Sequence, residues 1–310
     1  LTQIGRLEMK IISNEKVIYK FKHEMEYVEK ILPGEIVKVK TNDCWFQQIT
    51  TEDQVVKEIN YEILNPATGP LYIEGAEPGD LLKVKILCID VESKGSAVAV
   101  PNEGVLGDKV ENPTVKIINI EDNYAIFNDI KLPIEPMIGV IGVAPAKEDG
   151  EWATESPWKH GGNMDTKDIK VGSTLYFPVK QKGALLALGD CHAIMGDGEI
   201  CFTGLEIPAI VTLEIDLIKN KTVKWPLLET KEHTMVIASG DDLEEAIYEA
   251  TNEAVEHIKN CLNIKWEEAY ILASLSVDLK ISQVVDPKAT VRATIPKYVT
   301  TTKNIIESLK

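Results

Sequence analysis

The sequence predicts an α+β fold that is predominantly β, with a sandwich- or barrel-like β part and a helix-containing C-terminal part. Short apolar or alternating runs between glycine- and proline-rich turns fill about residues 1–220, a pattern typical of strands. In about residues 221–310, apolar side chains also recur at helical spacing, so this part is expected to be α/β. Because no repeat, linker or clean boundary interrupts the 310 residues, we expect a single domain over 1–310.

The composition is that of an ordinary soluble globular protein, with 44% hydrophobic and 26% charged residues. The formal net charge of −16 argues against nucleic acid and anionic membrane surfaces as partners, because both require a basic footprint. No apolar run approaches the roughly 20 residues of a membrane-spanning helix, and the first residues do not resemble a signal peptide. The five cysteines form no Cys-x-x-Cys pair, and we interpret them as free thiols in a cytoplasmic protein.

The first elements are expected to be short strands with one solvated face. Residues 35–40 alternate apolar and charged side chains after a Pro-Gly turn signal. This strand runs into the polar and aromatic segment 41–48, a plausible pocket wall in which Asp43 is the candidate site residue. A lone aspartate after a strand is more often a turn or cap residue, so both interpretations of Asp43 stay open.

The middle of the β part is a series of short strands joined by turns. Segment 65–70 has loop composition, and the Pro-Gly pair at 78–79 suits a type II turn. The run 133–146 is apolar and punctuated by glycines, but Gly139 and Gly142 lack the spacing of a dinucleotide fingerprint and no helix follows. Further strands are expected at 71–73, 81–87, 97–101, 114–120 and 124–127.

Residues 147–165 are predicted to form a long polar loop that ends in His160-Gly-Gly-Asn-Met-Asp165. Loops of this length inside a compact domain are usually functional or disordered. His160 is followed by two glycines, an asparagine and an aspartate, so donors of several kinds share a flexible backbone. A lone loop histidine is most often solvent-exposed, and a metal or catalytic role for His160 is the alternative.

The stretch 183–199 carries the densest chemistry in the chain. It begins as a buried strand and then places four ionisable side chains within ten residues: Asp190, His192, Asp197 and Glu199. On an extended chain Asp190 and His192 point the same way, and so do Asp197 and Glu199. Such groups at a strand end suit a divalent cation or a carboxylate general base. A polar hairpin with solvated acids is the structural alternative, and this stretch alone supports both about equally.

The chain after this stretch begins with another long β-type run, at 206–218. Apolar residues from 243 to 258 then recur at helical spacing, with acids in the first turn. A second set, from 266 to 273, marks another helix, and both apolar stripes are expected to face the core. Strand-like residues close the chain at 284–296, and 300–310 is expected to form a short tail.

Four motifs, taken in order, resemble the acetamidase/formamidase family. They are Asn65-Pro-Ala-Thr-Gly-Pro70, Glu74-Gly-Ala-Glu-Pro-Gly-Asp80, Gly161-Gly-Asn-Met-Asp165 and Gly189-Asp-x-His-Ala-x-x-Gly-Asp-Gly-Glu199. With Ile295-Pro-Lys297, the resemblance extends from about residue 7 to residue 297. It implies a β-rich fold and the hydrolysis of short amides, such as formamide or acetamide, to a carboxylate and ammonia. It also implies a bound divalent metal in place of a serine or cysteine nucleophile.

The residues themselves agree with metal-assisted hydrolysis. The chain has no Gly-x-Ser-x-Gly nucleophile elbow, and Cys191 lies on the strand face opposite to His192. A metal lowers the pKa of a bound water toward neutrality, and a nearby carboxylate can move the proton. We therefore expect Asp190 and His192 as metal ligands, with His160 or Asp43 completing the shell. The expected catalytic carboxylates are Glu199, as the general base, and Asp197, whose flanking glycines also suit a turn or a ligand.

Zinc is the expected metal, with calcium as the alternative. Two other functions stay open: a small-lactam hydrolase on the same scaffold, and a non-catalytic β-protein whose acid-rich turns bind calcium. His192 and His160 argue against the calcium protein, because imidazole is poorly suited to a calcium site. We expect a small amide as the substrate and a homo-oligomer as the assembly.

Overall fold

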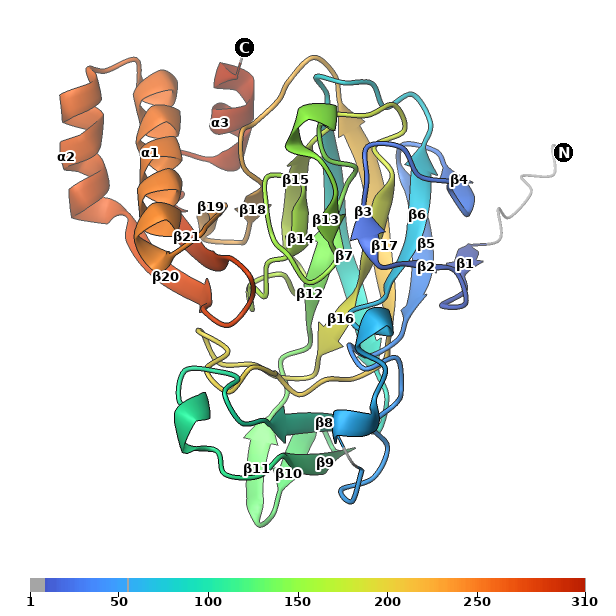
Figure 1. The fold of residues 1–310 in the computed structure, drawn as a ribbon. Coiled ribbons are helices and arrows are strands. Elements are labelled where there is room, and N and C mark those ends of the chain that lie inside the picture. The colour runs from blue at the N-terminus through green and yellow to red at the C-terminus, as the bar shows by residue number, and fades with distance from the viewer. Residues whose placement is uncertain (1–8, 55, 310) are drawn as a thin grey trace, which may run out of the picture.

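The computed structural model of the protein describes residues 9–54 and 56–309, and it confirms the predicted α+β, predominantly β fold. Within these residues strands dominate up to residue 240, and the α-helices follow near the C-terminal end (Figure 1). The helices are α1 (Leu243–Leu262), α2 (Trp266–Ser276) and α3 (Thr302–Ser308), with 3₁₀ turns at Val56–Glu58, Tyr61–Ile63, Gly107–Lys109 and Lys147–Asp149. No helix in these described ranges combines the length and the apolar character that crossing a bilayer requires.

The largest element is a nine-stranded sheet that contains strands from both ends of the chain. Only its β1–β5 pair is parallel, and every other neighbouring pair is antiparallel. The strands lie in the order β1 (Lys10–Ile12), β5 (Glu35–Thr41), β17 (Ala209–Ile218), β7 (Leu81–Val91), β15 (Thr174–Pro178), β18 (Leu227–Glu229), β19 (His233–Gly240), β21 (Ala289–Pro296) and β20 (Asp278–Gln283).

A six-stranded sheet packs against the first half of the large sheet. Its order is β14 (Gly161–Asn163), β12 (Met137–Gly142), β16 (Leu186–His192), β6 (Ala67–Ile73) and β2 (Val17–Ile18), with β4 (Glu29–Ile31) parallel to β6. Val37, Val84 and Val211 of the large sheet share one buried cluster with Ile138 and Leu188 of the six-stranded sheet. The two inner faces therefore form a sandwich core, as the alternating strands of the sequence predict.

Strand β16 lies in the middle of the six-stranded sheet and is buried over its whole length. Leu186 and Leu188 face the sandwich core, whereas Ala187 packs on the opposite side with Phe21. The cover on that side is the small pair β3 (Lys20–Phe21) and β13 (Trp152–Ala153). Because both faces are covered, the apolar run before Asp190 is continuous instead of alternating.

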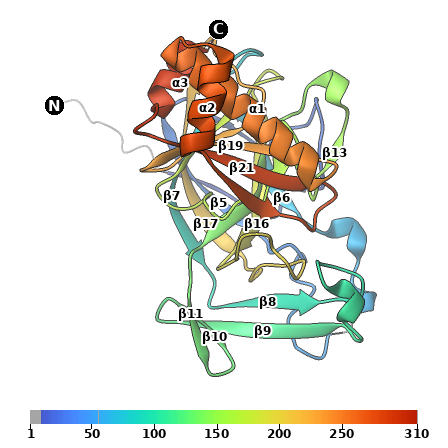
Figure 2. The same ribbon diagram turned by 90° about the vertical axis from the view of Figure 1, so that its left-hand side faces the viewer.

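A separate four-stranded sheet lies at the lower end of the molecule in Figures 1 and 2. Its order is β11 (Ile130–Pro133), β10 (Tyr124–Phe127), β9 (Thr114–Glu121) and β8 (Lys94–Ala99). Ser96 of β8 and His192 of β16 each form a β-bridge with Glu206. The C-terminal end of β16 is therefore tied to the four-stranded sheet.

The helices cover the C-terminal half of the large sheet. One face of α1, which includes Ala250, Ala254 and Ile258, packs on Val236 and Val291 of the sheet, as its apolar spacing predicts. The expectation for α2 is only partly correct. Ala269 and Ala273 are buried, but Trp266 is 40% and Tyr270 is 50% exposed. The sheet ends at β20, so the outer side of α2 has nothing to pack on within the described chain.

Two expectations for less regular segments are wrong. Segment 147–165 is not one long loop, because it contributes β13 and β14, and Gly161 and Gly162 pair with β12 at φ of 96° and 85°. A Cβ on Gly161 would lie 2.3 Å from Ile141 O, so only glycine permits this pairing. The tail after residue 300 forms α3, which is capped by Thr301 and buries Ile305 on the core.

Candidate functional site

The site begins at the C-terminal end of β16, where the predicted pair Asp190 and His192 lies on one side of the strand. Asp190 Oδ1 is 3.5 Å from His192 Nε2, and the side chains are 4% and 1% exposed. The two groups therefore lie together, as predicted, although the backbone at Asp190 is not extended as the prediction assumed. Asp190 has a φ of 51°, an unfavourable value for a residue other than glycine. Backbone strain of this kind is concentrated at functional sites.

Two acids that the sequence reasoning did not select complete the surroundings of His192. Glu206 Oε1 lies 3.2 Å and Asp165 Oδ1 lies 3.7 Å from His192 Nε2, and both side chains are 1–2% exposed. Asp165 follows β14 at the strained φ of 37°, and Glu206 stands just before β17. Separated segments of the chain thus converge on one imidazole.

Two glycines make this convergence possible. A Cβ on Gly139 would lie 2.4 Å from Asp165 Oδ1 and 2.8 Å from Asp190 Oδ2. A Cβ on Gly204 would lie 2.5 Å from His192 Nδ1. No side-chain carbon tolerates such distances, so the absence of a side chain at both positions is a condition for the arrangement.

The donor atoms fall into two adjoining groups, each with all its donors within 4.8 Å of one another. The first group contains Cys44, Asp190 and Glu206, and the second contains Asp165, His192 and Glu199. All six residues are buried. Imidazole nitrogen, thiol sulfur and carboxylate oxygen are the donors that zinc and similar cations use in proteins.

Most of these buried atoms lack a hydrogen-bond partner among the described residues. The atoms without a partner are the two carboxylate oxygens of Asp165, Oδ1 of Asp190, Oε2 of Glu199, Oε2 of Glu206, and the two ring nitrogens of His192. Buried polar groups in folded proteins nearly always have partners, and the exceptions require an explanation. A divalent cation fits this donor set because it would satisfy several oxygens and an imidazole nitrogen at once.

Burial governs the protonation of the site. It raises the pKa of Asp165 to about 7 and that of Glu206 to about 8. Burial and the neighbouring Asp165 raise the pKa of Glu199 well above its usual value. For His192, burial lowers the pKa, but the carboxylates of Glu206 and Asp190 outweigh it and hold the pKa well above its usual value. A cation would displace these protons, since metal ligands must be deprotonated.

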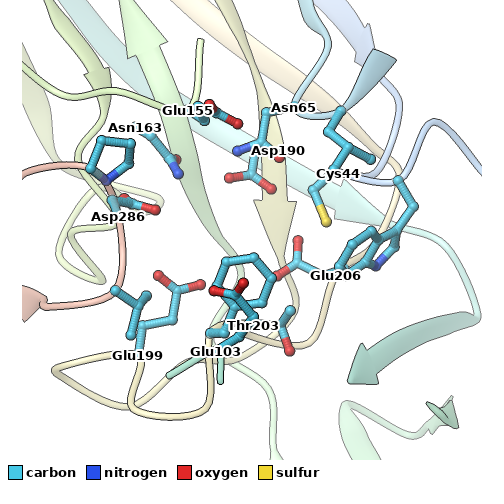
Figure 3. Close-up of a pocket in the computed structure, with 15 residues that line it drawn as sticks. Cys44, Asn65, Glu103, Glu155, Asn163, Asp190, Glu199, Thr203, Glu206 and Asp286 are labelled. Carbon is cyan, nitrogen blue, oxygen red and sulfur yellow. The ribbon is translucent and has the colours of Figure 1, made fainter. Parts of the chain in front are cut away.

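The donor groups open into a cavity of about 370 Å³ (Figure 3). Its acidic wall consists of Glu103, Glu155, Asp190, Glu199, Glu206 and Asp286, and its apolar wall of Trp45, Leu64, Phe202, Val285 and Pro287. Cys44, Asn65, Asn163 and Thr203 line the rest, and no lysine, arginine or histidine is among these lining residues. The cavity is therefore strongly negative as well as partly apolar.

The structure places Asp43 and His160 outside both donor groups. Asp43 Oδ1 accepts a 2.6 Å hydrogen bond from Gln47 N, and the residue lines a separate cavity of about 250 Å³. Burial raises its pKa to about 6. The His160 ring packs 4.9 Å from the ring of Phe21, and burial lowers its pKa to about 3. Asp43 thus has the geometry of a turn cap, and the His160 ring is buried beside Phe21 with no hydrogen-bond partner for either nitrogen among the described residues.

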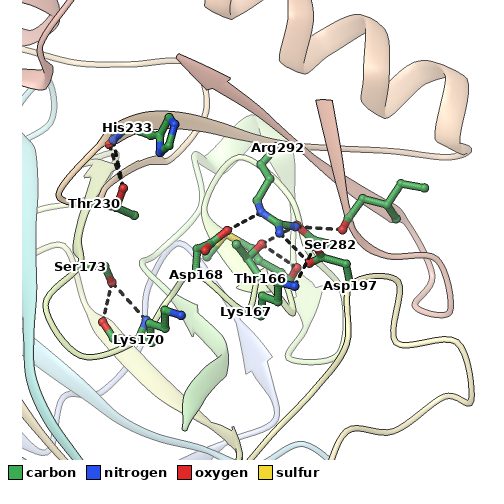
Figure 4. Close-up of polar contacts among 12 residues, drawn as sticks. Thr166, Lys167, Asp168, Lys170, Ser173, Asp197, Thr230, His233, Ser282 and Arg292 are labelled. Atoms are coloured by element: carbon green, nitrogen blue, oxygen red, sulfur yellow. Dashed lines mark hydrogen bonds and ion pairs between the residues drawn. The ribbon is translucent and has the colours of Figure 1, made fainter. Parts of the chain in front are cut away.

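Asp197 and Glu199 point in different directions, which corrects the expectation that they share a strand face. Gly198 and Glu199 have φ of 98° and 47°, so the chain turns between the two acids. Glu199 enters the cavity, whereas Asp197 accepts a 2.6 Å hydrogen bond from Arg292 and lies 3.2 Å from Lys167 (Figures 3 and 4).

The additional donors had only weak signals in the sequence. Asp165 is the last residue of a motif that already contains His160, and Cys44 is next to Asp43. Glu206 and Asp286 each stand beside a proline-containing strand boundary, which is typical of many solvated acids. Only the pairing of distant strands distinguishes these acids from solvated ones.

Comparisons with known proteins place the chain among amidases. The profile of the acetamidase/formamidase family matches residues 7–154 and 149–301. The formamidase of Methylophilus methylotrophus is 25% identical, with 88% of this chain and 86% of that protein covered. A putative formamidase of Schizosaccharomyces pombe is 26% identical, but the match covers 64% of this chain and 63% of that protein, less than two thirds of either. The crystal structure of an acetamidase from Bacillus halodurans has 42% identity and a TM-score of 0.91, with 93% of this chain and 97% of that chain covered.

Proposed function

The chain belongs to the acetamidase/formamidase family, whose named members are amide hydrolases, and we propose that it hydrolyses short aliphatic amides with the help of a divalent cation. Formamide or acetamide would be cleaved to a carboxylate and ammonia. The observation that carries the proposal is the buried donor set around His192, whose atoms lack hydrogen-bond partners and whose members Asp190, Glu199 and Glu206 line a small cavity.

We propose zinc as the cation, with calcium as the alternative. Asp190, His192 and Glu206 would hold it, together with Cys44 or Asp165. Imidazole and thiol donors favour zinc, whereas calcium prefers oxygen ligands alone. When bound, such a cation supplies the Lewis acidity that lowers the pKa of a coordinated water and polarises an amide carbonyl.

Glu199 is the proposed general base. Its carboxylate enters the cavity beside His192 and Asp165, and its Oε2 has no hydrogen-bond partner in the described structure. It accepts a proton from the water that attacks the carbonyl carbon and delivers this proton to nitrogen as the C–N bond breaks. The raised pKa of Glu199 supports this role, because the carboxyl can keep the proton until the amine leaves.

The cavity wall favours an uncharged substrate. Its acids, and the lack of a basic side chain among the lining residues, disfavour amides that also carry a carboxylate. Trp45, Leu64 and Phe202 provide an apolar surface for a short acyl group. Asn163 Oδ1 is buried without a partner on the same wall and can accept a hydrogen bond from the amide nitrogen.

A substrate panel tests the proposal. Formamide, acetamide, propionamide, succinamate and a small lactam are incubated with enzyme of defined zinc content, and ammonia release or ring opening is measured. We expect turnover of the neutral linear amides and little turnover of succinamate. Preferred opening of the lactam would favour the lactamase alternative, and no turnover of any amide would refute the amidase function.

The calcium-binding alternative is tested with His192→Ala. If the protein only binds calcium, this variant keeps calcium-dependent stability, and the parent hydrolyses no amide. If the protein is an amidase, the variant loses turnover.

Two expectations from the sequence remain proposals, namely a homo-oligomer and a cytoplasmic location. Light scattering of the purified protein tests the first, and fractionation of the source cells tests the second.

A further inference from the structure

Behind the acidic wall of the cavity, one buried arginine holds three segments together. Arg292 lies on β21, is 0% exposed and is one of two arginines in the sequence. Its Nε donates to Asp168 Oδ2 at 2.8 Å and its Nη2 to Asp197 Oδ1 at 2.6 Å (Figure 4). Its Nη1 donates to Ile281 O at 2.9 Å and to Ser282 Oγ at 3.1 Å. The planar guanidinium thus uses all three of its nitrogens.

Each of the three segments also delivers one acid to the site. Segment 165–168 carries Asp165, segment 197–199 carries Glu199, and segment 281–286 carries Asp286. Asp165 and Glu199 belong to the same donor group, and Glu199 and Asp286 both line the cavity.

Further hydrogen bonds join the same segments directly. Thr166 Oγ1 donates to Ser282 Oγ at 2.8 Å, and Gly198 N donates to Ser282 O at 2.8 Å. Val284 N donates to Gly198 O at 3.3 Å. The three segments are therefore fixed relative to one another through Arg292 and Ser282.

We propose that Arg292 is the positioning residue for the three acids on these segments, Asp165, Asp286 and above all Glu199. Arg292 does not line the cavity, so it acts through the residues that it binds. Besides burial, repulsion by Asp165 contributes to the raised pKa values of Glu199 and Asp286, so an anchor is needed to keep the three segments together. Asp165 and Glu199 also hold φ of 37° and 47°, which persist only when the surroundings enforce them. The contacts of Arg292 to Asp168 and Asp197 provide this constraint a few residues away.

The side chain must be arginine for a geometric reason. Its nitrogens reach two carboxylates, a hydroxyl and a carbonyl that lie in different directions. Lysine keeps the positive charge but offers a single nitrogen, so it cannot reach all four acceptors. Arg292→Lys thus keeps the positive charge but removes part of the hydrogen bonds that hold the three segments.

The first experiment compares Arg292→Lys with a structural control. This inference rests on the proposed amide hydrolysis, because kcat for acetamide or formamide is one of its measurements. We expect Arg292→Lys to lower kcat about tenfold with little change in KM, as when an interaction of the transition state is lost. The control is Glu229→Gln, which disturbs the contacts of Tyr176 and Lys297 in the same sheet outside the cavity. It should lower Tm and leave kcat unchanged.

A double-mutant cycle then separates positioning from general stability. If Arg292 acts through Glu199, adding Arg292→Lys to Glu199→Gln should lower kcat less than twofold further. Independent effects would instead multiply, and a multiplicative result would overturn the proposal. If Arg292→Lys does not fold, Asp197→Asn replaces it in the cycle. The Asp197 side chain is 33% exposed, and its change weakens only the ion pair of Arg292 that lies next to Glu199 in the sequence.

Hydrogen exchange gives a readout that does not depend on turnover. Arg292→Lys should accelerate amide exchange in 165–168 and 196–199, whereas Glu229→Gln should leave both segments protected. A parent protein without amidase activity would refute the proposed function, and the exchange data would still decide the role of Arg292. Unchanged exchange in both segments would overturn the positioning role even in an active enzyme.

Discussion

Two groups of buried charged side chains are adjacent in this protein, and they differ in how their charges are satisfied. The Arg292 group has a hydrogen-bond acceptor for each guanidinium nitrogen, at 2.6–3.1 Å. The His192 group is equally buried, but both ring nitrogens and several carboxylate oxygens lack a hydrogen-bond partner among the described residues, although three carboxylates lie 3.2–3.7 Å from Nε2. The same segments, 165–168 and 197–199, carry members of both groups.

This difference separates a structural group from a functional one. A buried charge is tolerated when its partner and its hydrogen bonds offset the loss of hydration. A group of acids without such partners lowers stability, and proteins retain it where a ligand or a reaction needs it. In this chain the Arg292 group, whose charges have partners, holds the segments that carry Asp165 and Glu199 of the His192 group.

The largest expected effect comes from removing the cation. Chelation should lower kcat about a thousandfold, since Lewis acid catalysis contributes several kcal/mol. It should leave the Arg292 group and the fold intact, because that group uses only side chains and backbone of the chain. Ammonia release, metal analysis and far-UV circular dichroism are measured before and after chelation. Zinc re-addition should restore activity, and full turnover by a demonstrably metal-free sample would contradict the assignment.

The second test removes the basic side chain from the Arg292 group. Arg292→Met should destabilise the protein by about 3 kcal/mol, because it leaves Asp168 and Asp197 without their buried counter-charge. Urea unfolding at constant pH measures the change. The control is Lys303→Met, which breaks the exposed pair with Glu307 and should change stability by less than about 1 kcal/mol. Equal effects of both changes would show that the Arg292 group is not a structural anchor.

A third test replaces Glu199, the proposed general base, with a side chain of the same shape that cannot accept the proton. Glu199→Gln should lower kcat about a hundredfold, the usual scale for the loss of a general base. The cation content should stay at the parent level, because the proposed ligands Asp190, His192 and Glu206 remain. Steady-state kinetics and metal analysis of the same preparation check both points. A near-normal kcat would exclude Glu199 as the base, and a loss of metal would make it a ligand.

The smallest expected effect is a gain in protein stability from a substitution in the His192 group. Both oxygens of Asp165 lack partners, so Asp165→Asn should stabilise the cation-free protein by about 1 kcal/mol while weakening zinc binding. Thermal unfolding with and without zinc measures the two effects in one experiment. A lower Tm in the cation-free state would mean that the Asp165 carboxylate has a stabilising partner.

The sequence was sufficient for the features that depend on local periodicity. Alternation predicts the strands of the sandwich, and helical spacing predicts α1. The two-residue spacing also predicts Asp190 beside His192, although Asp190 itself has a φ of 51°. These patterns record which face of an element is buried, so they are visible without knowledge of the neighbours.

The features that depend on other segments were not visible. Glu206 and Asp165 reach His192 because distant strands lie side by side. Asp197 and Glu199 separate because Gly198 and Glu199 have positive φ, which overrides the extended geometry assumed for them. Arg292 had no signal at all, because a buried arginine on an apolar strand is recognisable only by the acids that surround it.

The position of Arg292 near the end of the chain also affects the order in which the site can form. A chain is synthesised from its N-terminus and domains fold as their segments become available. Segments 165–168 and 197–199, with their acids, leave the ribosome about a hundred residues before the strand that carries their counter-charge. Until β21 has been synthesised, these segments lack the guanidinium that holds them in the complete chain. The strand that joins β19 to β20 in the sheet therefore also carries the side chain that holds the segments of Asp165 and Glu199.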